Sequence, residues 1–497
     1  MEVLEAIWGL LAVALLAFGL YCCYVKYVHL KYDYIPGAPR ASFFFGHLPY
    51  FWRKLKNKEV AHDLFIQWAE EHGPILRINY LHKISVVILS PEGVKEYLML
   101  PQYPKDPDIY SMFFNIFGVR FFGNGLISDP NHERWRKQRR IMDPAFSRTY
   151  LSGLMGIFNE KAEELMKVLE EKADGETEVD VMSLLRRVTL DIIAKVAFGL
   201  ELNTLHDYQT PFPRAVDLIA EGMTKIRIPF FQYIPWNRKK VKEIQDSLRL
   251  LRRTGEECFE RRRKAMLNDE ETPLDILTQI LKSEAQEGGC DYDSMLDNFV
   301  TFFFAGHETT ANLLSFTIME LGRQPEIVAK LQAEVDEFVG VRRDINYEDL
   351  GSLQYLSQVL KESLRLYPPA PGTVRWTGTE NVIEGVKIPA NTALNFNTYV
   401  MGRMERFFKD PLIFNPDRFG KDQPKPYYCY FPFALGPRSC IGQIFAQMEA
   451  KVIMAKLLQR FEFQLVPPQR FKVLESGTLR PFDPVVCRLN LRNPLGF

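Results

Sequence analysis

The chain has 497 residues, 46% of them hydrophobic, and it carries 62 basic and 62 acidic side chains. That length is enough for one large domain or two ordinary ones, and the balanced charge gives no general attraction for a polyanion, so we expect no nucleic-acid partner. The seven cysteines are odd in number and scattered, which argues against a disulfide framework and suits a reducing cytosol.

The first strong signal is at the N-terminus. Residues 6–25 (AIWGLLAVALLAFGLYCCYV) form a run of twenty uncharged residues, about 30 Å long as a helix, which matches the hydrocarbon core of a bilayer. Lys26 and Lys31 follow this run, so the positive-inside rule places the body of the protein in the cytosol. A cleaved signal peptide is the alternative, but the basic n-region and small-residue cleavage site that it requires are missing. We therefore predict a single-pass anchor over residues 1–30.

A short proline-containing stretch follows the anchor. Residues 31–40 include YIPGAPR, in which Pro36 and Pro39 cannot extend a helix. This pattern predicts a proline-rich hinge, and residues 41–497 then form the catalytic domain.

Helical periodicity dominates the remaining chain. Residues 75–90 and short runs near 382–396 and 461–492 are typical of strands. The segments that favour helices are 131–142, 150–175, 179–199, 240–267, 293–324, 325–338, 354–366 and 443–459. The expected class is mainly α with small β-sheets.

An aromatic segment, IRIPFFQYIPW at 226–236, stands between two of these helices. Two interpretations fit this segment equally well. It is either an ordinary buried loop or a second, shallow membrane contact beside the anchor.

The stretch FPFALGPRSCIGQ contains the candidate ligand Cys440. A cysteine that carries negative charge needs backbone N–H groups directed at its sulfur, and Gly436 and Gly442 would permit that close approach. The helix expected over 443–459 would add its N-terminal dipole. The pattern therefore favours a thiolate metal ligand over a buried inert cysteine.

The spacing Phe433-x-x-Gly436-x-Arg438-x-Cys440-x-Gly442 resembles the haem-binding signature of the cytochrome P-450 monooxygenases. The resemblance implies the cytochrome P-450 fold and a haem b whose iron takes the Cys440 thiolate as its axial ligand. It also implies that Arg438 pairs with a haem propionate and that Phe433 covers the proximal face.

The run DNFVTFFFAGHETTAN at 297–312 resembles the family's distal helix. Ala305 and Gly306 would leave room for a planar cofactor or O₂ and would permit a local opening of the helix. The resemblance implies that Glu308 and Thr309 form the catalytic acid–alcohol pair that delivers protons during O₂ activation.

Two further sets match the family's haem-supporting motifs. Glu362 and Arg365 lie on one helix face, and with Arg418 they resemble the family's structural Glu-x-x-Arg network. Trp135 and Arg139 also share a helix face and, with Arg375, resemble residues that hold the propionates. The further basic residues Arg134, Arg136, Lys137 and Arg140 form a patch that would steer an acidic electron donor.

The substrate side is aromatic and nearly uncharged, which favours a large apolar molecule. By family analogy the candidate pocket residues are Phe113, Phe114, Phe117, Phe121, Phe122, Ile219, Phe304, Ala305, Ala370, Val374 and Leu479. Several longer runs resemble the sterol side-chain hydroxylases of the family, which implies hydroxylation of a sterol with O₂ and with electrons that pass from NADPH through a cytochrome P-450 reductase at the endoplasmic reticulum membrane. A fatty-acid or xenobiotic hydroxylase is the alternative within the family, and a non-enzymatic haem sensor is disfavoured by Glu308 and Thr309.

Overall fold

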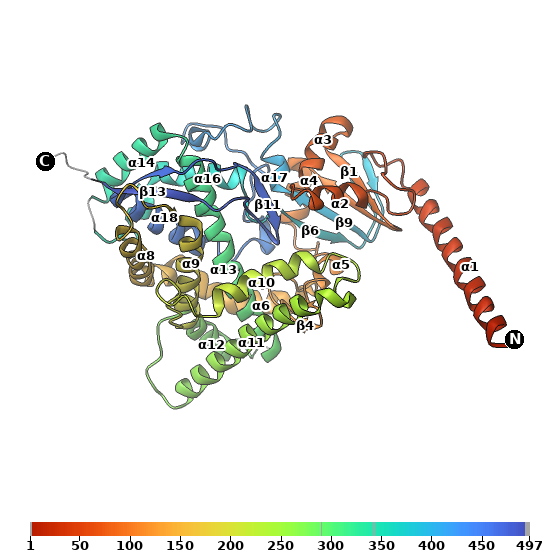
Figure 1. The fold of residues 1–497 in the computed structure, drawn as a ribbon, viewed down its shortest axis with the longest axis horizontal. Coiled ribbons are helices and arrows are strands. Elements are labelled where there is room, and N and C mark those ends of the chain that lie inside the picture. The colour runs from red at the N-terminus through yellow and green to blue at the C-terminus, as the bar shows by residue number, and fades with distance from the viewer. Residues whose placement is uncertain (1, 290, 341–342, 493–497) are drawn as a thin grey trace.

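Helices form most of the molecule, and one of them, at the N-terminus, projects away from the body (Figure 1). The computed structural model describes residues 2–289, 291–340 and 343–492, so the last residues of the expected catalytic domain, 493–497, lie outside the described part. The helices are α1 (Glu2–Lys31), α2 (Leu48–Lys56), α3 (Asp63–His72), α4 (Pro91–Met99), α5 (Pro107–Ser111), α6 (His132–Met142), α7 (Arg148–Ser152), α8 (Met155–Glu170), α9 (Val181–Phe198), α10 (Phe212–Lys225), α11 (Arg238–Leu267), α12 (Ile276–Gln286), α13 (Tyr292–Leu321), α14 (Pro325–Phe338), α15 (Asp349–Ser352), α16 (Gln354–Leu366), α17 (Thr398–Met401) and α18 (Gln443–Arg460). The expected mainly helical class is confirmed.

The strands form small sheets at the edges of the helical body. They are β1 (Ile75–Tyr80), β2 (Lys83–Ile88), β3 (Asn115–Ile116), β4 (Val119–Arg120), β5 (Val179–Asp180), β6 (Gly372–Thr377), β7 (Asn381–Ile383), β8 (Val386–Ile388), β9 (Thr392–Asn397), β10 (Phe461–Leu465), β11 (Val473–Ser476), β12 (Thr478–Pro481) and β13 (Val486–Leu491). The largest sheet has the order β1-β2-β9-β6, in which only the β2–β9 pair is parallel.

Side-chain caps set the start of the helices that carry the site. Asn131 caps α6, Asp180 caps α9 and Asp291 caps α13, each by accepting a hydrogen bond from a backbone N–H of the first turn. These caps explain why the expected and observed starts agree closely. The expected helix over 150–175 is instead divided into α7 and α8, because Gly153 and Leu154 lie between them outside helical structure.

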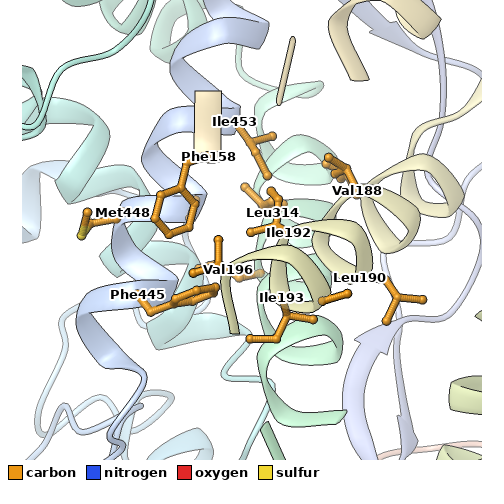
Figure 2. Packing of buried hydrophobic residues seen from close by; sticks show 14 of the residues in the cluster. Phe158, Val188, Leu190, Ile192, Ile193, Val196, Leu314, Phe445, Met448 and Ile453 are labelled. Carbon is orange, nitrogen blue, oxygen red and sulfur yellow. The ribbon is translucent and has the colours of Figure 1, made fainter. Parts of the chain in front are cut away.

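Helix α13 crosses the centre of the molecule and packs against α9, α16 and α18. Figure 2 shows Val188 and Ile192 of α9 beside Leu314 of α13, with Phe445 of α18 close by. These side chains are at most 2% exposed, so α13, which carries Glu308 and Thr309, and α18, which follows the cysteine loop, stand on a rigid core.

The segment after α1 is fastened to the body. The carbonyl oxygen of Pro36 accepts a hydrogen bond from the Arg77 N–H at 2.7 Å. Arg40 donates to the backbone oxygen of His29 at 2.9 Å and to the side chain of Asn79 at 2.9 Å. Residues 31–40, expected as a hinge, are therefore held against strand β1.

Candidate active site

The loop that carries Cys440 is shaped by backbone strain at two positions. Ala434 and Gly436 have positive φ angles of 55° and 69°. A Cβ at Gly436 would lie 2.1 Å from the carbonyl oxygen of Leu98 at the end of α4. Gly436 is therefore required by the turn and by the approach to α4, and not by the approach to sulfur that the sequence suggested.

The thiol of Cys440 faces two features that favour its anion and one that opposes it. The Gly442 N–H donates to the sulfur, and the charge of Arg139 lies nearby, but burial is the largest effect and raises the pKa of the Cys440 thiol. The side chain nevertheless remains accessible, as a ligand must be. A cation bound at the sulfur would favour the thiolate over the thiol.

Phe433 supports this loop through its backbone. Its carbonyl oxygen accepts a hydrogen bond from the Cys440 N–H at 2.8 Å. Its side chain is partly buried and packs against the main hydrophobic core.

Three cations, Lys105, Arg375 and Arg438, meet close to the cysteine loop. Arg375 is 1% exposed and Lys105 is 8% exposed. Burial is the main cause that lowers the pKa of Lys105 to about 8 and the pKa of Arg438 to about 9, and the charge of Arg375 lowers both further. Within the described residues, Nη2 of Arg375 and both Nε and Nη2 of Arg438 are buried without a hydrogen-bond partner. Buried unpaired guanidinium groups are costly, so this cluster requires an anion.

Helix α6 joins the cluster through one of its two candidate residues. The guanidinium of Arg438 stacks on the ring of Trp135 at 3.9 Å. Arg139 is engaged elsewhere, because it donates to the Ser439 carbonyl at 2.7 Å and to the Asp143 carboxylate at 2.6 Å. The structure therefore assigns Arg139 to holding the cysteine loop, whereas the sequence had placed it on a propionate.

The expected opening of α13 is not found, because helical structure continues through residues 305–309. Thr309 donates from its hydroxyl to the Ala305 carbonyl at 2.8 Å. A Cβ at Gly306 would lie 2.7 Å from Cδ1 of Ile193, so this glycine makes room for α9 and not for a cofactor. The prediction for Gly306 was wrong because one face of α13 packs directly on α9.

Glu308 is fully buried and held as an anion. Its Oε1 accepts hydrogen bonds from Arg186 at 2.6 Å, from Thr478 at 3.1 Å and from Asn312 at 3.2 Å. Burial is the largest single effect and would raise the pKa of the carboxyl group, but the charges of Arg186 and His307 and the hydrogen bonds from Asn312 and Thr478 together outweigh it, so the pKa is lowered. The carboxylate therefore stays ionised although it is removed from solvent.

Glu362, Arg365 and Arg418 form one buried network. Arg365 donates from Nε and Nη2 to the two carboxylate oxygens of Glu362, both at 2.7 Å. Arg418 donates to Glu362 at 3.2 Å, and the Asn415 N–H donates to it at 2.7 Å. Arg365 also donates to the Pro411 carbonyl at 2.7 Å, so the network ties α16 to the loop that precedes the cysteine segment.

A family model described as cytochrome P450 matches residues 36–484. The chain belongs to the cytochrome P450 family. Cytochrome P450 4d2 of Drosophila melanogaster is 29% identical to it over 88% of this chain and 89% of the relative. The 11-oxo-beta-amyrin 30-oxidase of Glycyrrhiza uralensis is 30% identical over 80% and 77%, and cytochrome P450 3A6 of Oryctolagus cuniculus is 26% identical over 98% and 97%.

Cytochromes P450 use a haem whose iron is bound by a cysteine thiolate, together with O₂ and electrons that a reductase supplies from NADPH. The residues present fit such a group. The accessible thiol of Cys440 can bind the iron. The buried guanidinium nitrogens of Arg375 and Arg438, which lack partners among the described residues, can bind the anionic propionates.

Four of the candidate pocket residues of this P450 form an aromatic cluster. Phe121 and Phe122 stack at 3.8 Å, Phe304 of α13 meets their edges at 5.8 and 6.1 Å, and Phe113 lies 6.5 Å from Phe122. This aromatic cluster joins the segment before α6 to the distal helix.

Leu479 lies on β12. Its N–H donates to the Pro369 carbonyl at 2.9 Å, which brings the strand beside exposed Ala370. Val374 is buried on β6. Ala305 of α13 is half-buried.

Two of the candidate residues point elsewhere. Phe117 stacks on Phe231 at 5.7 Å, so it packs against the connection between α10 and α11. Phe114 lies under the Arg120 guanidinium at 5.1 Å.

Sequence reasoning missed Lys105, Arg186 and Thr478. Lys105 stands in an otherwise unremarkable YPKDPD run, and Arg186 lies far from Glu308 in the chain. Only the packing of α9 on α13 brings Arg186 to the acid. The one signal available was that an acid in an apolar helix needs a cationic partner.

Proposed function

We propose that this chain is a membrane-anchored haem-thiolate monooxygenase with Cys440 as the axial ligand. The observation that carries the proposal is the cluster of Lys105, Arg375 and Arg438, because the buried guanidinium nitrogens of the two arginines lack partners among the described residues and fit the haem propionates. Trp135 would support this edge through its stack on Arg438. The haem, when bound, supplies the activation of O₂ for insertion into a C–H bond.

The Cys440→Ser variant tests the ligand. The wild-type protein should give the reduced carbon monoxide difference band typical of thiolate ligation, and the variant should lose it because a neutral hydroxyl does not replace the thiolate. Persistence of the band in the variant would refute the assignment.

We assign proton delivery to Thr309 and Glu308. The Thr309 hydroxyl donates to its own helix, and it keeps lone pairs that can accept a proton-donating partner. Glu308 is held ionised by Arg186 and is shared with Thr478 and Asn312. In the relay that we propose, the ionised Glu308 carboxylate takes up a proton before passing it on, and the Thr309 hydroxyl positions it.

For the substrate we propose a sterol, with the cholesterol side chain at carbon 24 as the site of hydroxylation. The aromatic cluster of Phe113, Phe121, Phe122 and Phe304 supports a large apolar substrate. The resemblance of the longer runs to sterol side-chain hydroxylases supports the sterol. Product analysis with cholesterol and with a long-chain fatty acid, under reductase and NADPH, tests this choice. Oxidation of the fatty acid alone would contradict it.

We propose the endoplasmic reticulum membrane as the location, with a single span and a cytosolic catalytic domain. Helix α1 is long and apolar enough to cross a bilayer, because an 18-residue window within residues 3–31 has a mean hydropathy of 2.2 and contains no buried residue. The connection at 226–236 supports a second contact, because Phe230, Tyr233 and Trp236 are 76%, 71% and 82% exposed. Protease protection of sealed microsomes would test the orientation.

The partner we propose is a cytochrome P450 reductase. A hollow of about 740 Å³ beside the cysteine loop is lined by Arg136, Arg139, Arg140 and Ser439. This basic surface lies directly outside the loop that bears Cys440, which supports docking of an acidic electron donor there.

A further inference from the structure

Helix α1 is exposed along its N-terminal part and begins to be buried against the body of the protein at Tyr21. Side chains from residue 3 to residue 20 are exposed, a stretch of roughly 27 Å. From Tyr21 onward one face of the helix packs on the body. Tyr21 Oη lies 2.8 Å from Nδ1 of His82, and His29 Nε2 lies 2.8 Å from the Leu81 carbonyl oxygen. The bilayer surface of a membrane-inserted chain therefore lies close to Tyr21.

A chain of aromatic contacts leads from this level to helix α2. Phe44 lies 5.6 Å from Phe18 and 5.8 Å from Tyr21, and its neighbour Phe45 lies 5.3 Å from Trp52 of α2. Phe45 and Trp52 remain 40% and 41% exposed. Aromatic residues with a polar edge prefer the membrane–water interface. The turn before α2, and α2 itself, are thus placed where the span leaves the bilayer.

Helix α2 has an inner and an outer face. Tyr50 and Phe51 point inward, with their rings 5.6 and 6.1 Å from Trp68 of α3. Trp52 and Leu55 are exposed on the outside. This fixes which face of α2 is free to meet a partner.

The outer face is also basic. Helix α2 contains no acidic residue, and its last turn carries Arg53, Lys54 and Lys56, with Lys58 following. Lys54 pairs with Glu59 at 2.7 Å. The other three cations form no ion pair with any residue that the structure describes.

We infer that α2 and the turn before it form an interfacial membrane element that binds anionic phospholipid headgroups. Trp52, Leu55 and Phe45 enter the interface, and Arg53, Lys56 and Lys58 meet the headgroup charge. Because α1 and α2 are joined through Phe44 and the β1–β2 turn, the element fixes the height of the catalytic domain above the bilayer. The inference rests on the proposed membrane span of α1.

The test uses the full-length protein in nanodiscs of equal phosphatidylserine and phosphatidylcholine, with bromine on the acyl chains of one lipid or the other. Subtracting the emission of Trp52→Phe isolates the quenching of Trp52. Subtracting Trp8→Phe isolates a tryptophan inside the span. We expect brominated phosphatidylserine to quench Trp52 more than brominated phosphatidylcholine does. One basic side chain at an anionic surface should raise the local ratio of phosphatidylserine to phosphatidylcholine about fivefold.

Two matched variants isolate the charge. The triple change Arg53→Gln, Lys56→Gln, Lys58→Gln should leave Trp52 quenched and bring the two lipids to parity. A control triple on another surface, Lys409→Gln, Lys421→Gln, Lys425→Gln, should keep the preference. Quenching of Trp8 without Trp52 would overturn the inference and leave the span intact. A lipid preference that survives the first triple would overturn it as well. Absence of quenching at Trp8 would reject the span and the inference together.

Discussion

At the scale of single residues, the site is defined by charges that are buried without their counter-ions. Arg375 and Arg438 have nitrogens that no described residue satisfies, whereas Glu308 is paired through its Oε1 with Arg186. The two arginines are therefore suited to bind the anionic edge of a cofactor. Glu308 is an internal acid that the protein itself keeps ionised.

The Lys105–Tyr110 pair predicts a pH dependence of haem retention. The two side chains are joined by a hydrogen bond of 2.7 Å, and the pKa of each is lowered to about 8. They titrate as a pair, so the cluster loses one positive charge as the pH rises through about 8. Haem retention should therefore be constant below pH 8 and fall above it, measured by haem transfer to apomyoglobin.

The same shifts predict the opposite trend for the protein without haem. Both pKa values lie below those of the unfolded chain, so between about pH 8 and 10 the unfolded chain binds more protons and the free energy of unfolding rises with pH. Lys105→Met should flatten both trends. An unchanged pH profile in that variant would show that the pair does not control the cluster.

We expect the Thr309→Ala variant to couple NADPH consumption to product formation less efficiently than the wild-type protein. Removing the hydroxyl takes away the group that positions protons, so peroxide release should rise relative to product while substrate binding is kept. The measurement is peroxide formed per NADPH consumed. Thr310→Ala is the neighbouring control, because Thr310 is buried on another face of α13. Equal coupling in wild type and Thr309→Ala would count against the relay.

At the scale of elements, the contact between α9 and α13 determines how the distal helix is placed. Ile193 occupies the space that a side chain at Gly306 would need, and Arg186 from the same helix reaches Glu308. One helix thus supplies both the steric limit and the counter-charge for α13. On the opposite side, Glu362, Arg365 and Arg418 hold α16 to the loop before the cysteine segment.

Gly306→Ala tests the α9–α13 contact. The new methyl would lie 2.7 Å from Ile193, and overpacking costs ~1–3 kcal/mol, of which the gain in helix propensity offsets about 1 kcal/mol. The free energy of unfolding by urea should therefore fall, and Ile193→Ala in the same chain should relieve the clash. Gly156→Ala in α8, with nothing within 4 Å of the new methyl, is the control. A loss in the control as large as that in Gly306→Ala would exclude the steric explanation.

At the scale of the whole molecule, the basic hollow beside the cysteine loop predicts salt-dependent electron transfer. Replacing Arg136 and Arg140 with Gln should raise the KM for reductase severalfold at low ionic strength and have little effect at high ionic strength, where the charges are screened. Steady-state turnover against reductase concentration at two salt concentrations measures this. Lys421→Gln with Lys425→Gln is the control on an exposed loop away from the hollow. A KM in the control that rises equally would exclude a specific docking site.

The sequence by itself determined the family, the cysteine, the helix that carries Glu308 and Thr309, and the apolar N-terminal helix, because each depends on residues that are close together in the chain. A ten-residue loop motif or a twenty-residue apolar run can be recognised without knowing how the rest of the chain packs. Only the tertiary structure decided which charges meet. Lys105 joins Arg375 and Arg438, Arg186 reaches Glu308, and Arg139 turns to the Ser439 carbonyl, because such contacts depend on how distant helices are packed. Burial of the thiol likewise raises the pKa of Cys440, because the pKa of a thiol depends on its surroundings in space and not on its neighbours in sequence.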